Sequence, residues 1–381
     1  MPENLRVLIV GAGVGGLALA QGLRRAGIAV TVCERDSSAV GRLQGYRLRI
    51  DPNGLDALDR LLPPNLAKAV WEASSSPSRT GYLDGTPPAE PVERNVSINR
   101  LTLREILLHG LDDVVEFGRE CTGYRLDDGV TATFADGSTK SADVLIAADG
   151  VNSVVRKQYL PHAPVLDTGV RILYGRFPLT RETAELIPDE WFGIYSGLVG
   201  PDNQHIGIAP VHSRRPAPLP GLTDPGDYVM CLYAARTELL PCSDGELRAA
   251  TGEQLRDLTV SLTRQWNPEA SELLALADPA TLFPIFMRTS VPIDPWPTTS
   301  VTLLGDAIHA MSPAVGVGAN IALRDAELLA AKLAEVAAGA ALVPALREYE
   351  TAMLGYGFDA VRRSAKFGAL RMGQPPLPVP A

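Results

Sequence analysis

The sequence predicts an α/β protein in which a β-rich segment is inserted into a discontinuous domain built on a parallel sheet. Three observations predict this arrangement. Residues 5–33 read as a buried strand, a helix and a second buried strand, whereas residues 165–290 contain short runs of β-forming residues between Pro and Gly. Residues 300–337 then return to a buried strand followed by a long helix rich in Ala and Leu.

The N-terminal unit is the most regular part of the chain. Residues 5–10 are an almost continuous apolar run, as expected for a strand covered on both faces. A glycine-rich stretch follows at residues 11–16, and a helix with apolar periodicity ends near Gly27. The second strand, residues 29–33, leads directly into Glu34.

The central part of the chain contains one clear helix and several strands. Leucines at helical spacing predict a helix over residues 99–111, with Asn99 as its N-cap. Residues 244–266 are expected to form a helical excursion, and residues 75–92 a surface connection without periodicity. The expected strands are residues 130–134, 143–147, 170–177, 192–199, 205–210 and 228–234, of which the last four predict an antiparallel sheet.

The C-terminal part returns to the pattern of the first. A strand is expected at residues 300–304, and helices at 318–337 and 344–370, before a Pro-rich tail. The resulting domain assignment is residues 1–75, 95–165 and 291–340 for the discontinuous domain, 166–290 with parts of 76–94 for the β-sheet domain, and 341–381 for a C-terminal helix and tail.

Composition narrows the class of protein. The 381 residues include 35 Lys and Arg against 44 Asp and Glu, a formal charge of −9, so no nucleic-acid partner is expected. No apolar run approaches the roughly 20 residues of a membrane span. Because the N-terminus also lacks the basic start of a signal peptide, we expect a cytoplasmic protein without a membrane partner. The cysteines are widely scattered and show no metal-ligand spacing, so no metal site is expected.

The first motif that carries chemistry is a GxGxxG formed by Gly11, Gly13 and Gly16 between a buried strand and a helix. The first glycine permits a tight turn, the second lets a pyrophosphate approach the backbone, and the third lets the helix pack on the strand. Glu34, at the end of the second strand, can accept hydrogen bonds from a ribose. This context favours a dinucleotide site over a purely structural turn, and Glu34 disfavours the 2′-phosphate of NADP as the ligand there.

Two further stretches follow buried strands. Asp149 is followed by Ser153 and Arg156 at helical spacing, and a purely structural interpretation, a turn with a capped helix, fits as well as a functional one. Asp306 is followed by a loop rich in Pro and Gly just before the long helix, where backbone amides can meet an anion or a carbonyl.

Together, these three stretches resemble the fingerprints of the class A FAD-dependent aromatic monooxygenases, the group that includes p-hydroxybenzoate hydroxylase. The resemblance covers nearly the whole chain. It implies a Rossmann-like FAD-binding domain, discontinuous in sequence, with an inserted β-rich substrate domain and C-terminal helices. It also implies that Asp306 holds the ribityl chain of FAD. The ADP half would be bound by Gly11, Gly13, Val14, Gly16, Glu34 and Arg35, and the pyrimidine end of the flavin would be lined by Pro313, Gly316, Val317, Gly318, Ala319 and Asn320.

The resemblance also implies roles for charged residues outside the glycine-rich turns. Arg100 matches a family arginine that contacts the cofactor, and Arg104 lies one turn further on. Arg47 falls near a flavin-contacting position, with Arg49 as the alternative register. Asp149 and Arg156 belong to an element implicated in binding both FAD and NAD(P)H, and NAD(P)H would bind transiently over the flavin.

The activity implied by the resemblance is NAD(P)H- and dioxygen-dependent hydroxylation of an aromatic or polyketide-like small molecule through a flavin hydroperoxide. No catalytic side chain is assigned, because the cofactor performs the oxidation. Epoxidation, Baeyer–Villiger oxidation and oxidative decarboxylation would use the same fingerprints. A non-oxygenating flavin dehydrogenase or reductase and a non-catalytic nucleotide sensor are the competing classes, and the expected assembly is a monomer or a homodimer.

Candidate residues of a substrate pocket come from the β-rich segment and the loop after Asp306. They are Phe192, Tyr195, His205, Phe286, Met287 and Pro313, although packing in the core is the default for each apolar one. His309 follows Asp306 closely, and we expect it to have a local hydrogen-bonding or packing role.

Overall fold

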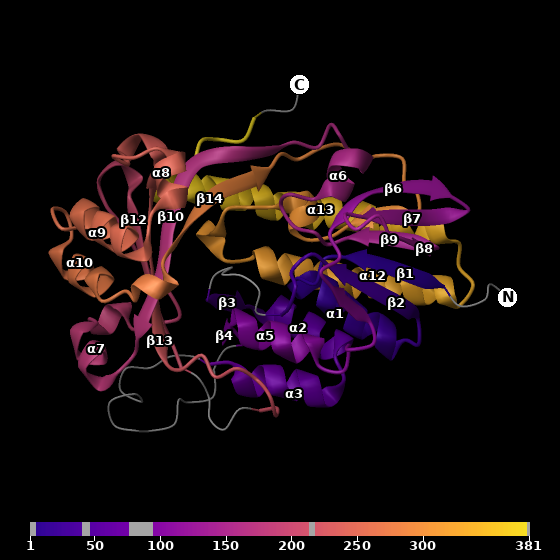
Figure 1. Cartoon of the computed structure of the whole chain (residues 1–381), viewed down its shortest axis with the longest axis horizontal. Coiled ribbons are helices and arrows are strands. Elements are labelled where there is room, and N and C mark those ends of the chain that lie inside the picture. The colour runs from indigo at the N-terminus through magenta and orange to yellow at the C-terminus, as the bar shows by residue number, and fades with distance from the viewer. Residues whose placement is uncertain (1–4, 40–45, 76–93, 213–217, 379–381) are drawn as a thin grey trace.

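The computed structural model describes residues 5–39, 46–75, 94–212 and 218–378. Its elements form one α/β part and one part built on an antiparallel sheet, which lie side by side in Figure 1. The predicted surface connection at residues 75–92 lies outside the described residues, apart from Ser75, as do most of residues 76–94. The division of the chain into domains stays a prediction.

The α/β part is built on a five-stranded sheet with the order β15-β9-β1-β2-β5, in which every pairing is parallel. Its inner strands are apolar and buried, because other elements cover both faces of the sheet. A three-stranded antiparallel sheet, β6-β7-β8, accompanies it. The bounds are β15 (Val301–Leu303), β9 (Val144–Ala147), β1 (Arg6–Val10), β2 (Ala29–Glu34), β5 (Val115–Phe117), β6 (Cys121–Asp127), β7 (Gly129–Phe134) and β8 (Thr139–Ala142).

Helices pack against this sheet and against one another. The predicted cap is confirmed at α5, where the Asn99 side chain accepts hydrogen bonds from the amides of Leu101 and Thr102. The long C-terminal helix packs against α12, and the two share one core with the sheet. The helices are α1 (Val14–Arg25), α2 (Pro52–Leu61), α3 (Pro64–Ala73), α5 (Arg100–Leu108), α6 (Val154–Tyr159), α11 (Asp306–His309), α12 (Gly318–Ala337) and α13 (Leu342–Met372).

The β-rich segment forms a five-stranded antiparallel sheet with the order β11-β12-β13-β10-β14. One face of this sheet packs against helices α7 to α10, which lie at the left of Figure 1. Successive residues of a strand point to opposite faces, so every second residue lies on the other face, which is turned toward the rest of the molecule. The elements are β10 (Val165–Pro178), β11 (Ser196–Val199), β12 (His205–Val211), β13 (Tyr228–Arg236), β14 (Phe283–Ser290), α7 (Arg181–Leu186), α8 (Asp244–Ala249), α9 (Gly252–Thr263) and α10 (Pro268–Ala275).

Two sequence predictions need correction in this segment. The strand expected at residues 192–199 is shorter, because Phe192 ends a 3-10 helix and the strand begins only at Ser196. The helical excursion at residues 244–266 is two helices. Ser243 and Thr251 each form a capping box, so α9 starts anew after α8 has ended.

The two parts are joined through a short hairpin, β3 (Arg47–Ile50) with β4 (Val96–Asn99). Tyr228 on β13 donates a hydrogen bond to the backbone carbonyl of Tyr46 (2.7 Å) and accepts one from the side chain of Asn99 (3.0 Å). The Tyr46 hydroxyl in turn donates to the carbonyl of Thr281. These buried bonds connect the start of α5 to the antiparallel sheet. Within the described ranges, no helix is both long and apolar enough to cross a bilayer.

Candidate active site

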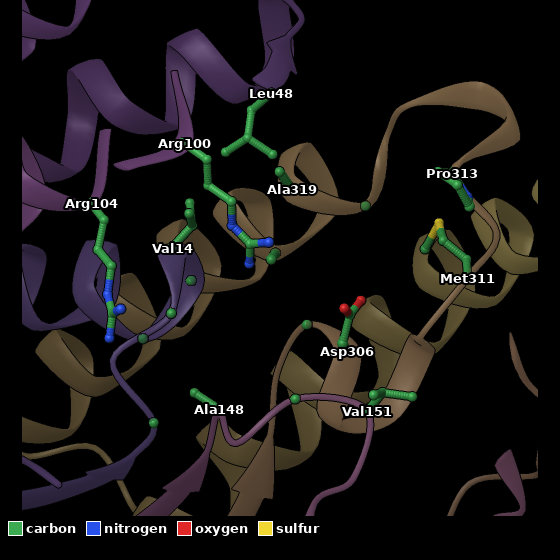
Figure 2. A pocket seen from close by; sticks show the side chains of 18 of the residues that line it. Val14, Leu48, Arg100, Arg104, Ala148, Val151, Asp306, Met311, Pro313 and Ala319 are labelled. Atoms are coloured by element: carbon green, nitrogen blue, oxygen red, sulfur yellow. The ribbon is translucent and has the colours of Figure 1, made fainter. Parts of the chain in front are cut away.

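The three motifs found in the sequence converge at one edge of the parallel sheet. Gly11 follows β1, Asp149 follows β9, and Asp306 follows β15, while Glu34 ends β2. Because these strands are parallel neighbours, their carboxyl ends meet at the same edge, where open α/β sheets bind ligands. All four residues line a single cavity of about 970 Å³ that continues to the antiparallel sheet. Figure 2 shows the Asp306 carboxylate and the Arg100 guanidinium pointing into this cavity from opposite sides.

The first turn explains why glycine occupies each position of the motif. Gly11 has a φ of +109°, and a Cβ there would lie 2.3 Å from the carbonyl oxygen of Ala148. A Cβ on Gly16 would lie 2.2 Å from the carbonyl oxygen of Gly11, so this glycine permits the close contact between α1 and β1. A Cβ on Gly13 would meet no atom within 4 Å, and Gly13 caps α1 without a side-chain hydrogen bond. The open amides at the start of α1 therefore face the cavity beside Val14.

Glu34 is held in place by the backbone. Its carboxylate accepts hydrogen bonds from the amides of Ala12 (2.6 Å) and Asp36 (2.9 Å). Arg104 on α5 lies 3.7 Å from the same carboxylate and donates hydrogen bonds to the carbonyls of Ala12 and Ala39. Arg104 thus braces the turn and lines the cavity, and the exposed Arg35 lies at the cavity wall next to Glu34.

The residues of the second motif, Asp149, Ser153 and Arg156, have different roles: some cap helix α6, and Asp149 also lines the cavity. Ser153 caps α6, and one carboxylate oxygen of Asp149 accepts a hydrogen bond from the amide of Val154 (2.9 Å). The other carboxylate oxygen of Asp149 is buried without a hydrogen-bond partner among the described residues, and burial raises the pKa of this group. Arg156 does not line the cavity, because its guanidinium donates inward to the carbonyls of Ala307 and Val151. The role of Arg156 in binding FAD or NAD(P)H stays a prediction.

Asp306 begins α11 immediately after Gly305, which has a φ of +61°. Its side chain is open to the cavity, yet protein atoms surround it closely on the other sides. This burial raises the pKa of Asp306, although His309 and Arg100 act in the opposite direction.

Sequence reasoning missed the buried residue that supports this junction. Asp325 on α12 accepts hydrogen bonds from the amide of Gly305 (2.8 Å), from the imidazole of His309 (2.6 Å) and from the hydroxyl of Tyr356 (2.6 Å). Its exposed fraction is 0%, and a carboxylate in the middle of an Ala- and Leu-rich helix was the signal that could have revealed it. The local role expected for His309 agrees with this contact.

The loop before α12 closes one side of the cavity. Pro313, Gly316, Gly318 and Ala319 line it, and Figure 2 shows Pro313 and Ala319 at its border. Val317 and Asn320 are not among the residues that line it, and their contact with the flavin stays a prediction. The Asn320 side chain instead accepts a hydrogen bond from the amide of Asp51 (2.9 Å) and donates one to the carbonyl of Arg49 (3.0 Å), so it joins α12 to β3. Val317 is buried, with 7% of its surface exposed.

Of the six residues predicted to form a substrate pocket, Tyr195, His205 and Pro313 line the cavity, and Phe192, Phe286 and Met287 do not. Phe192 packs in the core on the helix-covered face of the sheet. Phe286 lies on β14 with the guanidinium groups of Arg171 and Arg248 stacked on its ring, at 5.0 and 3.9 Å from the ring centre. Met287 is buried on the same edge strand, in one apolar cluster with Tyr174 and Met230, and does not itself line the cavity.

The remaining wall of the cavity comes from residues that the sequence analysis did not single out. They share the face of the antiparallel sheet on which His205 lies, or belong to the last turn of α13: Ile172, Tyr174, Met230, Leu232, Phe367, Arg371 and Met372. The alternation of side chains along β10 and β13 could have revealed some of these residues. Tyr174 and Leu232 are paired in register, so their side chains point to the same face of the sheet. Arg47 and Arg49 both line the cavity, so each of the two alternative registers places an arginine there.

Comparisons with known proteins agree with this arrangement. A family model described as a NAD(P)-binding Rossmann-like domain matches residues 9–70, and one described as an FAD binding domain matches residues 260–364. The chain is 31% identical over 381 residues to a 3-amino-4-hydroxybenzoate 2-monooxygenase, PtmB3, of Streptomyces platensis, with 95% of this chain and 87% of that protein covered. A solved structure of a Photorhabdus luminescens protein, assigned as an FAD containing monooxygenase, has 36% identity and a TM-score of 0.81, and covers 94% of this chain and 96% of its own.

Another relative is considerably longer than this chain. The dual O-methyltransferase/FAD-dependent monooxygenase elcB of Phaeosphaeria nodorum is 34% identical over 383 residues. This alignment covers 88% of the chain but 41% of the fungal protein. The chain therefore spans about two fifths of the length of this curated relative.

Proposed function

This chain belongs to the family of FAD-dependent monooxygenases, and on that premise we propose that it uses NAD(P)H and dioxygen to hydroxylate an aromatic or polyketide-like small molecule. One observation carries the proposal. The glycine-rich turn, the Asp149 element and the Asp306 element are far apart in sequence, yet all line one cavity. That cavity reaches from the open amides of α1 to an apolar and aromatic wall on the antiparallel sheet, so one space has room for a cofactor and a substrate together.

The residues of the parallel-sheet edge fit FAD. The space above Gly13 admits a pyrophosphate at the open N-terminus of α1, where backbone amides and the helix dipole favour an anion. Asp149 has a buried acceptor oxygen without a partner among the described residues, which a hydroxyl of the cofactor would satisfy. In the proposed arrangement, Glu34 accepts from the adenine ribose, Asp306 accepts from the ribityl chain, and Arg100 and Arg104 contact the cofactor from α5.

Bound FAD would supply the redox chemistry by taking a hydride from NAD(P)H and then activating dioxygen. The protein's own part is to bind, orient and exclude water. The amides at the start of α12 have no side-chain cap, so they can hydrogen-bond to charge that develops on the pyrimidine side of the flavin. The apolar residues of the sheet-facing wall keep bulk water away from the oxidised carbon of the substrate.

We also propose a cytoplasmic monomer or homodimer without nucleic-acid or membrane partners. The four cysteines are unpaired, as a reducing compartment permits, and three of them are buried. Size-exclusion chromatography with light scattering checks the oligomeric state. An assembly larger than a dimer would contradict this part of the proposal.

Incorporation of labelled oxygen tests the activity. Purified protein containing FAD is incubated with NADH or NADPH, ¹⁸O₂ and a panel of phenols and aromatic polyketides, and the products are analysed by mass spectrometry. We expect one labelled oxygen atom in the product and substrate-stimulated oxidation of the nicotinamide. Substrate oxidation that proceeds without oxygen and leaves no label would identify a flavin dehydrogenase or reductase. A protein that cannot bind FAD at all would favour a nucleotide sensor.

A further inference from the structure

The short helix that carries Asp306 lies on a buried polar cluster. The cluster consists of His309 at the end of α11, Asp325 on α12 and Tyr356 on α13. The exposed fractions of His309 and Asp325 are 1% and 0%. Of these four described residues, Asp306 alone lines the cavity. The cluster can therefore act on a ligand in the cavity only through Asp306.

Packing fixes the imidazole of His309. Its Nε2 lies 2.6 Å from a carboxylate oxygen of Asp325, and a Cβ on Gly357 of α13 would lie 2.8 Å from the ring. Its Nδ1 is buried without a hydrogen-bond partner among the described residues. Asp306 and His309 are three residues apart on α11, a spacing that places two Cβ atoms about 5–6 Å apart. His309 thus acts on Asp306 through its charge and not through a hydrogen bond.

The surroundings of His309 favour the charged imidazolium. Burial lowers the pKa of His309, but the carboxylates of Asp325 and Asp306 raise it by more, so the net shift is upward. The contact with β14 joins backbone atoms, the amide of Ser290 and the carbonyl of Ala310 (2.8 Å). The charged and titratable groups around this junction are Asp306 on the same helix, Asp325 and Arg324 on α12, Tyr356 on α13, Arg156 on α6 and Arg100 on α5.

Asp306 in turn depends on His309 for its own charge. Its carboxylate points into the cavity (Figure 2), while burial by the protein raises its pKa. Asp325 acts in the same direction, whereas the charges of His309 and Arg100 act against it. A cofactor bound in the cavity would displace water from this carboxylate and so make its charge more costly. The nearby imidazolium offsets that cost, because the attraction between opposite charges strengthens when water is removed.

We propose that His309 is a positioning residue for FAD, whose imidazolium keeps the Asp306 carboxylate ionised, and so able to accept a hydrogen bond from the ribityl chain, when the cofactor occupies the cavity. Asp325 supports this arrangement, because one of its carboxylate oxygens holds both the imidazole and the amide of Gly305. Its other oxygen accepts the hydrogen bond from Tyr356. The inference rests on the proposed function, because it takes the ribityl chain to lie at Asp306.

A double-mutant cycle tests the coupling between the two side chains. FAD affinity is measured at about pH 7, by quenching of FAD fluorescence, for wild type, His309→Gln, Asp306→Asn and the double variant. His309→Gln can still donate a hydrogen bond to Asp325 but carries no charge. We expect it to weaken FAD binding roughly tenfold when Asp306 is present and less than about twofold in the Asp306→Asn background, a coupling of the size that neighbouring groups show. Equal effects in the two backgrounds overturn the proposal.

Tyr356→Phe is the matched control, because it removes a neutral partner of the same Asp325 carboxylate. Any effect that it has on FAD binding through the shape of the junction should be the same in both backgrounds. His162→Gln, at an exposed histidine, should leave the FAD affinity unchanged. A coupling of Tyr356→Phe with Asp306→Asn as large as that of His309→Gln would show that His309 has only a structural role.

The protonation state of His309 is an independent readout. The chain has five histidines, so comparison with His309→Gln assigns the ¹⁵N signals of this imidazole. In the FAD-bound wild type, we expect both ring nitrogens to carry a proton at about pH 7. Over the pH range in which one of these protons is lost, the FAD affinity of wild type should fall by roughly the same factor of ten, while that of His309→Gln stays constant. A neutral imidazole in the FAD-bound protein at about pH 7 would contradict the proposal.

Asp306→Asn keeps the proposal testable if His309→Gln does not fold. It replaces the carboxylate by a neutral group of the same shape, so the fall in FAD affinity with rising pH should be smaller than in wild type. An equally steep fall in both proteins would show that Asp306 does not respond to the charge of His309.

These outcomes separate the inference from the proposed function. A protein that shows the coupling but never incorporates labelled oxygen would contradict the monooxygenase activity and leave the role of His309 standing. A protein that incorporates the label, but whose FAD affinity responds to His309→Gln equally with and without Asp306, would contradict only the role of His309.

Discussion

At the residue scale, the glycines of the first turn differ in what a methyl group would meet. Gly11 combines a positive φ with a backbone carbonyl 2.3 Å from the position of a Cβ, so the fold itself requires glycine there. Gly13 is extended, with a φ of −77°, and open on its Cβ side. No contact with the described chain requires glycine at position 13, and in the proposed arrangement the pyrophosphate of FAD does.

The pair Gly11→Ala and Gly13→Ala tests this distinction. Gly11→Ala should reduce the free energy of unfolding of the flavin-free protein by about 1–3 kcal/mol, the usual range for overpacking. Gly13→Ala should stay within about 1 kcal/mol of wild type in the same measurement. It should nevertheless weaken FAD binding, measured by flavin fluorescence, because the methyl group occupies the space proposed for the pyrophosphate. Unchanged FAD affinity in Gly13→Ala would place the cofactor elsewhere.

At the scale of elements, one buried carboxylate ties three helices to the end of a strand. Asp325 of α12 bonds the amide of Gly305 after β15, His309 at the end of α11 and Tyr356 of α13. Burial alone would lower the pKa of His309, but Asp325 and Asp306 outweigh it, so this pKa is raised above its usual value. The junction that aims Asp306 into the cavity therefore favours a His309–Asp325 ion pair.

This ion pair predicts a pH dependence of stability. Because the pKa of His309 is raised in the folded protein, its contribution is complete below the unfolded-state value of about 6.5 and is lost as the pH rises through the folded-state pKa. Chemical denaturation between about pH 6 and about pH 9 should thus show a steeper loss of unfolding free energy for wild type than for His309→Gln. Tyr356→Phe is the matched control, with a loss of about 1.5–3 kcal/mol, the range for a hydrogen bond to a charged group, that does not depend on pH in this range. Parallel pH profiles of wild type and His309→Gln would show that the pair carries no charge.

At the scale of the whole molecule, the cavity exists because the antiparallel sheet is fastened to the parallel-sheet part. The contact runs from Tyr228 on β13 to the Tyr46 carbonyl and to Asn99, which also caps the helix that begins with Arg100. Arg176 lies over the rings of both Tyr46 and Tyr228, at 5.0 and 5.1 Å. The two walls of the cavity are thus linked by the buried hydrogen bonds of Tyr46 and Tyr228.

Tyr228→Phe tests this link. It should reduce the free energy of unfolding by about 1–3 kcal/mol, since the Tyr46 carbonyl and the Asn99 amide lose a buried partner. It should also weaken FAD binding, because Asn99 then orients the start of α5 less firmly. Tyr233→Phe is the control on the opposite face of the same strand, where the hydroxyl bonds Gln204 at 2.6 Å. A similar FAD affinity in both variants would show that the link does not reach the cofactor half.

Much of the fold and part of the candidate site could be predicted because the signals are local. Apolar runs and helical spacing depend on residues that are close together in the sequence. For this reason α1, α12 and the Asn99 cap lie where the sequence predicts them. Gly11 and Gly16 carry their backbone constraints in the motif itself. The family resemblance added FAD as the cofactor, which the comparisons support, and the first and third stretches lie within the two matched family models.

By itself, the sequence determined the α/β class and the turns that end its parallel strands, because conformation and periodicity are properties of neighbouring residues. Only the tertiary structure decided which side chains reach the cavity. It turned Arg156 inward to the carbonyl of Ala307, sent Phe286 to the helix-covered face of the sheet, and brought Arg371 of the last helix beside Tyr195. The physical reason is that a side chain's partners are set by packing between elements distant in sequence, and neither spacing nor residue type along the chain encodes that packing.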